Sequence, residues 1–225
     1  MMKKILNKFN LLEWGMILSV IGFTLYFSLI NTTSSLFYII IDAIAAICGI
    51  FCVVLCAKGK KSQYIWGVFN ILGYVIIAFI NKYYGEVMLN ALYYLPSQFL
   101  GYYFWQRHEN KETNDVIGKC LTSKQTILSL IGCLILIITY KFLLDGLGGN
   151  QTLLDSASTI ISVVANILML ARFREQWLLW IIIDIITVIM WALAKDYVMV
   201  VMWSVYLINA FYGYYKWTKL EKRNV

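Results

Sequence analysis

The chain has 225 residues, of which 61% are hydrophobic and only 14% are charged. Soluble globular domains are about half apolar and about a quarter charged, so this composition excludes an ordinary soluble domain. The formal net charge is +7, but the basic residues lie at the ends of apolar segments rather than on one soluble face, which argues against nucleic-acid binding. We therefore expect an integral membrane protein.

Eight apolar runs follow one another along the chain, each close to the length of about 20 residues that a helix needs to cross a bilayer. Lipid offers the backbone no hydrogen-bond partner, so each run is expected to be a helix. The single proline, Pro96, leaves nearly all of them unbroken. The sequence thus predicts an all-α membrane protein with eight transmembrane helices, at residues 14–30, 37–57, 64–81, 86–105, 126–144, 153–172, 177–194 and 197–217.

The charges at the ends of these runs predict the orientation. If the N-terminus is cytoplasmic, sixteen of the nineteen basic residues fall on the inside, and only Lys82, Lys141 and Lys195 fall outside, as the positive-inside rule predicts. The run that begins at Trp14 lacks a small-residue cleavage site and is followed almost at once by another run, so we expect it to remain in the mature protein. Both termini should be cytoplasmic.

An internal repeat organises the chain. Residues 101–105 match residues 213–217 at an offset of 112 positions, and four of the five residues are identical. Residues 66–70 and 180–184 share a tryptophan followed four positions later by an amide or a carboxylate, at an offset of 114. Such self-similarity is typical of transporters built from duplicated helical units.

The repeat predicts the domain organisation. One helix earlier, Asp42 corresponds to Asp155 at an offset of 113, so three helices repeat as three helices. The single helix between them makes the two units parallel rather than inverted. The expected divisions are the N-terminal tail and extra transmembrane helix, 1–35; the first three-helix unit, 36–105; a cytoplasmic connector, linker helix and outside loop, 106–150; the second three-helix unit, 151–217; and a cytoplasmic tail, 218–225.

Several residue groups suggest chemistry at first sight, but simpler roles account for them. Cys48, Cys52 and Cys56 share one helix face with no histidine nearby, so we interpret them as packing residues rather than metal ligands. The only histidine, His108, lies in the charged connector and is interpreted as solvated. No nucleophile with an evident base lies inside the predicted helices, so we expect no enzyme, no metal and no cofactor.

The best candidate for a binding site lies in the second unit. Ionisable groups inside a membrane span are costly and mark substrate paths. Asp184 lies about 10 Å along its helix, and Trp177 and Trp180 precede it at spacings that place all three on one face, a surface that suits a flat cation. The alternative is that Trp177 belongs to an interfacial belt and Asp184 makes a packing hydrogen bond. The repeat partners Trp66 and Asn70 favour a site.

Further polar residues inside the predicted spans extend this candidate site. They are Asn90, Gln98, Asn166, Tyr206 and Asn209. Gln98 follows Pro96 by two residues, where the proline frees a backbone carbonyl and can kink the helix beside a cavity. For each of these amides, an interhelical hydrogen bond is as good an explanation as contact with a ligand.

The sequence resembles the Pnu family of bacterial vitamin transporters, most closely its nicotinamide riboside branch, over nearly the whole chain. The resemblance rests on the pattern W-x-x-W-x-x-x-N/D at Trp177, Trp180 and Asp184. It rests also on a longer stretch that contains Trp66, Gly67, Asn70, Tyr84, Gly85, Glu86, Pro96, Gln98 and Trp105. The pattern, the repeat and the helix plan are separate features, and they agree.

This resemblance implies a SWEET-like fold, a homotrimer in the bacterial cytoplasmic membrane, and a site between the two three-helix units. It also implies uptake of nicotinamide riboside, an NAD precursor, by facilitated diffusion without ATP, with a cytosolic kinase that traps the substrate. The positive pyridinium ring fits the two tryptophans and Asp184. Thiamine is also cationic and aromatic and is the alternative substrate, whereas riboflavin and deoxynucleosides, linked to other branches, are neutral and would not need a charged Asp184.

Overall fold

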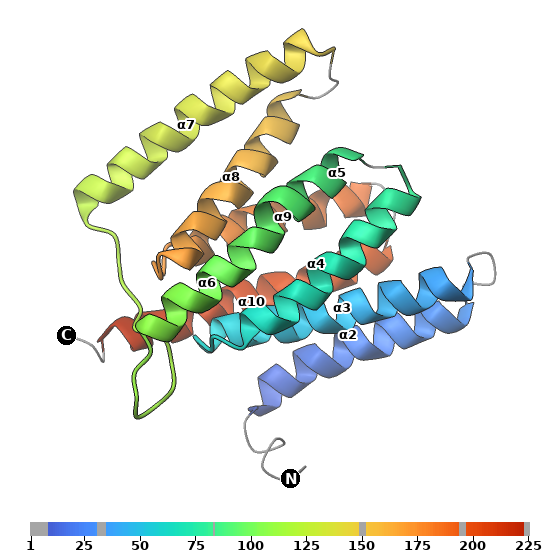
Figure 1. Ribbon diagram of the computed structural model, residues 1–225, viewed down its shortest axis with the longest axis horizontal. Coiled ribbons are helices and arrows are strands. Elements are labelled where there is room, and N and C mark those ends of the chain that lie inside the picture. The colour runs from blue at the N-terminus through green and yellow to red at the C-terminus, as the bar shows by residue number, and fades with distance from the viewer. Residues whose placement is uncertain (1–8, 31–34, 83, 149–151, 194–196, 223–225) are drawn as a thin grey trace.

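The computed structural model describes residues 9–30, 35–82, 84–148, 152–193 and 197–222, apart from the side chains of residues 85, 154, 155, 190, 191, 197–199, 221 and 222 (Figure 1). The side chain of Asp155, the predicted partner of Asp42, therefore lies outside the described residues. The elements are α2 (Leu11–Ile30), α3 (Leu36–Ala57), α4 (Gln63–Ile80), α5 (Tyr84–Leu89), the π-helical turn η1 (Asn90–Tyr94), α6 (Leu95–Arg107), α7 (Ser123–Gly146), α8 (Thr152–Leu170), α9 (Gln176–Leu193) and α10 (Tyr197–Lys222).

Helices α5 and α6 and the turn η1 between them form one continuous run, so the described residues contain eight helical segments, each overlapping a predicted span. Of the described helices, α2, α3, α4 and α7 are long and apolar enough to cross a membrane, and α8 and α9 contain shorter apolar stretches. The predicted all-α fold of a multi-pass membrane protein is confirmed. Figure 1 shows α7 set apart from the bundle, where it packs along α8 and buries none of its residues.

The break expected at Pro96 is a widened helical turn. Pro96 is the second residue of α6, and its ring nitrogen has no hydrogen to donate to the preceding turn. Directly before it, Leu95 N–H donates to Asn90 O, five residues back, which is the π-helical pattern. Gln98 Nε2 donates to Tyr94 O, the last carbonyl of the π-helical turn. The widened turn at the proline thus changes the direction in which the Gln98 side chain points from its helix.

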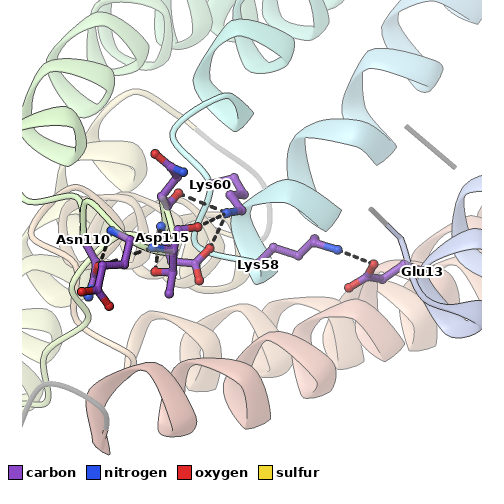
Figure 2. A network of polar contacts seen from close by, with 8 residues as sticks. Glu13, Lys58, Lys60, Asn110 and Asp115 are labelled. Atoms are coloured by element: carbon purple, nitrogen blue, oxygen red, sulfur yellow. Dashed lines mark hydrogen bonds and ion pairs between the residues drawn. The ribbon is translucent and has the colours of Figure 1, made fainter. Parts of the chain in front are cut away.

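The N-terminal helix α2 is fastened to the rest of the bundle through Glu13, whose exposed fraction is 0%. Asn10 and Glu13 cap the start of α2 reciprocally, because each side chain accepts the backbone N–H of the other. The Glu13 carboxylate also receives Lys58 Nζ at 2.6 Å (Figure 2) and Tyr212 OH at 2.5 Å. One carboxylate therefore holds α2 against the end of α3 and against α10.

The connector between α6 and α7 joins two loops that are distant in the sequence. Val116 N–H donates to Gly59 O at 2.8 Å, in the loop after α3. Lys119 exchanges two backbone hydrogen bonds with Arg172 and Arg174, in the loop after α8. Gly59 and Arg172 both have a φ of +69°, in the left-handed region. Each loop therefore turns through one left-handed residue, and the backbone hydrogen bonds of the connector link the two loops to each other.

Ion pairs hold the connector against the first of these loops. Lys60 pairs with Asp115 at 2.6 Å, as Figure 2 shows. Lys61 pairs with Glu109 at 2.7 Å, and this hydrogen bond raises the pKa of the Lys61 ammonium above its usual value. The charged connector is thus held against this loop by ion pairs, and exposed pairs of this kind add about 1 kcal/mol at most.

A buried aromatic cluster joins the two halves of the bundle near the connector. Trp105 of α6 donates its Nε1 to Met169 O of α8, and Trp217 of α10 donates its Nε1 to Cys56 O of α3, both at 3.0 Å. The two indoles have an exposed fraction of 0%, and their centroids are 5.5 Å apart. These two hydrogen bonds fix the distance between the halves at the end of the bundle near the connector.

The helix bounds correct the register of the predicted repeat by one residue. Helix α4 begins and ends 113 positions before α9, and α3 ends 113 positions before α8. The pairing of Asn70 with Asp184 assumed an offset of 114. In the register of the helices, Asp184 corresponds to Ile71 and Trp180 to Gly67. Because successive residues of a helix differ by about 100° in direction, the pairing inferred from the letters alone does not match the packing.

Candidate functional site

A cavity of about 370 Å³ lies between the halves of the bundle, walled by α3, α4, η1 and α6 on one side and by α8, α9 and α10 on the other. This volume is within the range of small-molecule sites, about 300–1,000 Å³. In the described lining, Asp184 is the one charged residue. The amides of the lining are Gln63, Asn70, Asn90, Gln98, Asn166 and Asn209, and its aromatic residues are Tyr94, Trp177, Trp180, Trp203 and Tyr206.

Helix α9 supplies the charge and two indoles. Trp177, Trp180 and Asp184 lie on the face of α9 that lines the cavity. Asp184 is only 5% exposed, and its side chain makes no hydrogen bond or ion pair within the described part of the chain. A buried carboxylate without a partner is unfavourable, so this wall is suited to a cationic ligand.

Trp177 is held in place by a glycine on the facing helix. A Cβ atom at Gly213 of α10 would overlap the Trp177 indole, so the glycine makes room for the ring. The ring also meets the edge of Trp217, with centroids 6.3 Å apart and an interplanar angle of 67°. Trp177 is 3% exposed, and its Nε1 has no hydrogen-bond acceptor in the described structure. Packing therefore fixes the ring and leaves its donor unused.

Gln98 occupies the opposite wall. A Cβ atom at Gly67 of α4 would overlap Gln98 Oε1, so the glycine allows the amide to lie directly against α4. Gln98 Nε2 donates to Tyr94 O at 3.3 Å, whereas Oε1 is buried and accepts no hydrogen bond from the described residues. The widened turn before Pro96 and the absence of a side chain at Gly67 together determine where this acceptor lies.

Helix α10 contributes three further residues to the cavity, Trp203, Tyr206 and Asn209. Asn209 Nδ2 donates to Val53 O of α3 at 3.1 Å, which leaves Asn209 Oδ1 buried without a donor among the described residues. Trp203 Nε1 is likewise buried and unpaired there. The amide of Asn209 therefore joins α10 to α3 and also leaves one acceptor unpaired, so a packing role does not exclude contact with a ligand.

Four buried polar atoms of the lining thus lack partners within the described residues. Two are donors, Trp177 Nε1 and Trp203 Nε1, and two are acceptors, Gln98 Oε1 and Asn209 Oδ1. Buried polar groups are nearly always satisfied, and each unsatisfied one costs about 1–3 kcal/mol. Their convergence with Asp184 on one cavity indicates a site for a small polar cation. Among the described residues, no three His, Cys, Asp or Glu side chains gather as a metal site would require.

Nine of the ten residues that the sequence suggested for the site line this cavity: Asn70, Asn90, Gln98, Asn166, Trp177, Trp180, Asp184, Tyr206 and Asn209. Trp66 does not belong to the lining. Its ring stacks on Phe51 of α3, with centroids 4.7 Å apart and an interplanar angle of 24°. Asn70 Nδ2 donates to Ala45 O at 2.9 Å, and Asn90 Nδ2 donates to Glu86 O at 2.9 Å. That these residues bind a substrate stays a prediction.

Sequence reasoning missed Gln63, Tyr94 and Trp203 in the lining. Trp203 precedes Tyr206 by three residues and Asn209 by six, a spacing that places all three on one helix face and should have identified it. Gln63 is the first residue of α4, where a membrane protein has many polar residues, and it carries no distinctive signal. Tyr94 ends the π-helical turn, whose altered phase no regular helical period predicts.

The chain is similar to a known protein family and to several of its members. A family model described as "Nicotinamide mononucleotide transporter" matches residues 39–219. The chain is 39% identical over 192 residues to the nicotinamide riboside transporter PnuC of Neisseria mucosa, which covers 81% of this chain and 73% of that protein. It is 41% identical over 182 residues to the protein of the same name from Haemophilus influenzae, covering 80% of each.

A solved structure shares the fold. The crystal structure of the vitamin B3 transporter PnuC superposes with a TM-score of 0.80 and 35% sequence identity, covering 96% of this chain and 94% of that chain. The overlap therefore includes the helices that wall the cavity.

Proposed function

The chain belongs to the nicotinamide mononucleotide transporter family and is a transporter rather than an enzyme, and we propose that it takes up nicotinamide riboside, an NAD precursor, by facilitated diffusion. Two relatives named as nicotinamide riboside transporters support this substrate. The cavity supports the riboside over the mononucleotide, because the phosphate of the mononucleotide would face Asp184 with no Lys or Arg in the described lining.

The pyridinium ring is assigned to the α9 wall. An indole face attracts a cation through its quadrupole, which is worth about 2 kcal/mol when the pair is desolvated. Trp177 and Trp180 provide such faces beside the unpaired carboxylate of Asp184. The carboxylate adds an attraction that is strong because little water enters a buried site. Charge and shape are thus recognised by the same three side chains.

The ribose hydroxyls are assigned to two amides of the lining, Gln98 of α6, across the cavity from α9, and Asn209 of α10. A hydroxyl both donates and accepts, and the buried acceptors Gln98 Oε1 and Asn209 Oδ1 await donors. The observation that carries the proposal is this combination, an unpaired buried Asp184 and two unpaired amide oxygens among the residues that line one cavity. A neutral substrate would leave Asp184 without a partner, which disfavours riboflavin and deoxynucleosides.

We further propose that the cavity is opened alternately to the two sides by rocking of two parallel three-helix units, α3 to α6 and α8 to α10, in a SWEET-like three plus one plus three arrangement linked by α7. The 113-residue register and the reciprocal bonds of Trp105 and Trp217 support this division. A disulfide that joined the two units across the cavity would then stop transport, and unaltered transport would contradict rocking.

The remaining expectations rest on the family resemblance. We propose a homotrimer in the bacterial cytoplasmic membrane with both termini inside, and a cytosolic kinase that phosphorylates the substrate and so keeps uptake running down its gradient. Phosphorylation would add a charge that the acidic cavity rejects, which explains why the product does not leave by the same route. The apolar surface of α7, none of whose residues is buried, supports a face covered by lipid or by neighbouring subunits.

The test is a tryptophan-fluorescence titration of the detergent-purified protein with nicotinamide riboside, nicotinamide mononucleotide and thiamine. We expect saturable quenching by the riboside, and Asp184→Asn should raise its Kd by about 30-fold, which corresponds to about 2 kcal/mol. Asp115→Asn removes a carboxylate from the connector, outside the lining, and is the matched control that should leave Kd unchanged.

Each alternative gives a different pattern. Tighter binding of thiamine than of the riboside would keep the cation site and change the substrate. Tighter binding of the mononucleotide, or a Kd that does not respond to Asp184→Asn, would contradict the assignment of the pyridinium to the α9 wall.

A further inference from the structure

A second cavity, of about 470 Å³, lies among α2, α3, α4 and α10. It extends toward the helix ends that are distant from the connector, because its lining includes Asp42 near the start of α3, Ile77 near the end of α4 and Met202 near the start of α10. Figure 1 shows α2 running alongside α3, and α2 contributes Val20, Phe23, Thr24 and Phe27 to the lining. This cavity is therefore separate from the site between the two halves, and the N-terminal helix helps to enclose it.

Its chemistry repeats that of the first cavity. Phe23, Phe27, Tyr74, Trp203 and Tyr206 give it an aromatic lining, and Asp42 is the one charged residue among the described residues of this lining. The first cavity likewise combines aromatic rings with a single carboxylate. Aromatic faces with one acidic group are suited to an organic cation and unsuited to an anion.

Asp42 has no structural role that would explain it. It is the seventh residue of α3, so it lies about 9 Å along a helix that is long and apolar enough to cross a membrane. Its side chain is open to the cavity and makes no hydrogen bond or ion pair within the described residues. A carboxylate at such a depth is costly, and one without a partner indicates function rather than packing.

Only a thin partition separates the two cavities. They share Cys52, Val53, Asn70, Trp203 and Tyr206 as lining residues. Asn70 is fixed by its bond to Ala45 O at 2.9 Å, and Asn70 and Tyr206 both pack directly against Gly49. A ligand leaving one cavity through this partition would therefore enter the other after displacing a few side chains.

We infer that the second cavity is a separate, weaker site for the same aromatic cation, in which Asp42 attracts the substrate before it passes the Asn70–Tyr206 partition, and that α2 serves as its outer wall. This inference rests on the proposed function for the identity of the cation. A carboxylate in a cleft with apolar walls raises the local concentration of a cation about tenfold or more. The expected kinetic effect is thus on capture of dilute substrate, not on affinity at Asp184.

Uptake into proteoliposomes tests this role. Asp42→Asn should raise the half-saturating concentration of nicotinamide riboside about tenfold, while the Kd measured in detergent at the Asp184 site changes less than twofold. Asp42→Glu retains the charge and should behave like the wild type. The neutral dihydro form of the riboside has nearly the same shape without the positive charge, and its uptake should not respond to Asp42→Asn.

Equilibrium binding tests the site directly and does not depend on transport. Calorimetry with nicotinamide riboside should show a tight and a weak site in the wild type, and Asp42→Asn should abolish the weak site while the tight one remains. A single site in the wild type, or a weak site that is unchanged in Asp42→Asn, would overturn the second site. Equal losses of charged and neutral substrate in Asp42→Asn would also overturn it, because they would indicate a structural residue.

The two proposals fail differently. If the wild type binds the cation but does not carry it into proteoliposomes, the proposed function fails while calorimetry still decides the second site. If transport occurs and calorimetry shows one site that is indifferent to Asp42, the proposed function stands and the second site is rejected.

Discussion

Trp105 in α6 and Trp217 in α10 make the same contact in opposite directions across the molecule. Each indole donates to a carbonyl at the end of the first helix of the other half, Met169 O or Cys56 O, at 3.0 Å. Glycines four residues earlier, Gly101 and Gly213, leave room for an aromatic ring of the middle helix in each half. Positions that hold the two halves together are thus alike in both.

Positions that face the cavity are not alike. In the register of the helices, α4 has Gly67 and Ile71 where α9 has Trp180 and Asp184. Gln98 fills the space over Gly67, so one wall is rich in amides and the other in indoles with a carboxylate. A symmetric frame therefore holds an asymmetric cavity, which suits the proposed ligand with its charged ring at one end and hydroxyls at the other.

The largest effects should come from breaking the shared frame. Trp105→Ala and Trp217→Ala each remove a fully buried indole and its hydrogen bond, which should cost about 3–5 kcal/mol of stability. Because the contacts are equivalent, the two losses should agree to within about 1 kcal/mol. Thermal unfolding followed by size-exclusion chromatography in detergent measures them. A large loss for one variant and a small loss for the other would show that the halves are not equivalent.

Moving the carboxylate across the cavity tests the asymmetry. Asn70→Asp combined with Asp184→Asn keeps the net charge and relocates it from the indole wall to α4. We expect nicotinamide riboside to bind at least about tenfold more weakly than to the wild type, because the charge no longer stands beside Trp177 and Trp180. Fluorescence titration against Asp184→Asn alone supplies the comparison. Full recovery of affinity would show that net charge, rather than position, is recognised.

The two left-handed loop residues should respond differently to mutation. Gly59→Ala forces a Cβ into the left-handed region and toward Leu220 and Val116, so it should cost about 1–2 kcal/mol. Arg172→Gly relieves the same backbone strain but loses the bond from Arg172 Nη1 to Ile117 O, and the two effects should cancel to within about 1 kcal/mol. Thermal unfolding decides this. Equal destabilisation by both variants would contradict a strained Arg172.

The smallest effect is expected at the tryptophan outside the lining. Trp66→Phe keeps a ring against Phe51 and should change the Kd of the riboside less than twofold, within about 0.4 kcal/mol. Trp180→Phe lies in the lining and should raise the Kd about fivefold, or about 1 kcal/mol. The same titration compares the two. A larger effect at Trp66 than at Trp180 would mean that the ligand lies on the other side of α4.

The helices themselves were predictable from the sequence, because the requirement for about 20 apolar residues per span is a property of the bilayer. The chemical class of the candidate site was also predictable, because a carboxylate such as Asp184 is costly inside a membrane span and therefore marks a functional residue. The register of the repeat was not. Trp66 and Trp180 look equivalent when the two sequences are aligned by residue type. The bounds of α4 and α9, however, differ by 113 positions, so the two tryptophans are displaced by one residue relative to each other.

The sequence by itself therefore determined that this protein lies in a lipid bilayer, where its helices run, and which residues are too polar for that environment. The tertiary structure alone decided which of these residues converge, because convergence depends on which helix faces meet. Gln98 lies at the cavity because of a π-helical turn and a glycine on α4, and the Asp42 cavity has α2 as one wall, a helix that Glu13 joins to the end of α3 and to α10. Contacts between residues as much as 202 positions apart leave no periodic trace in the chain.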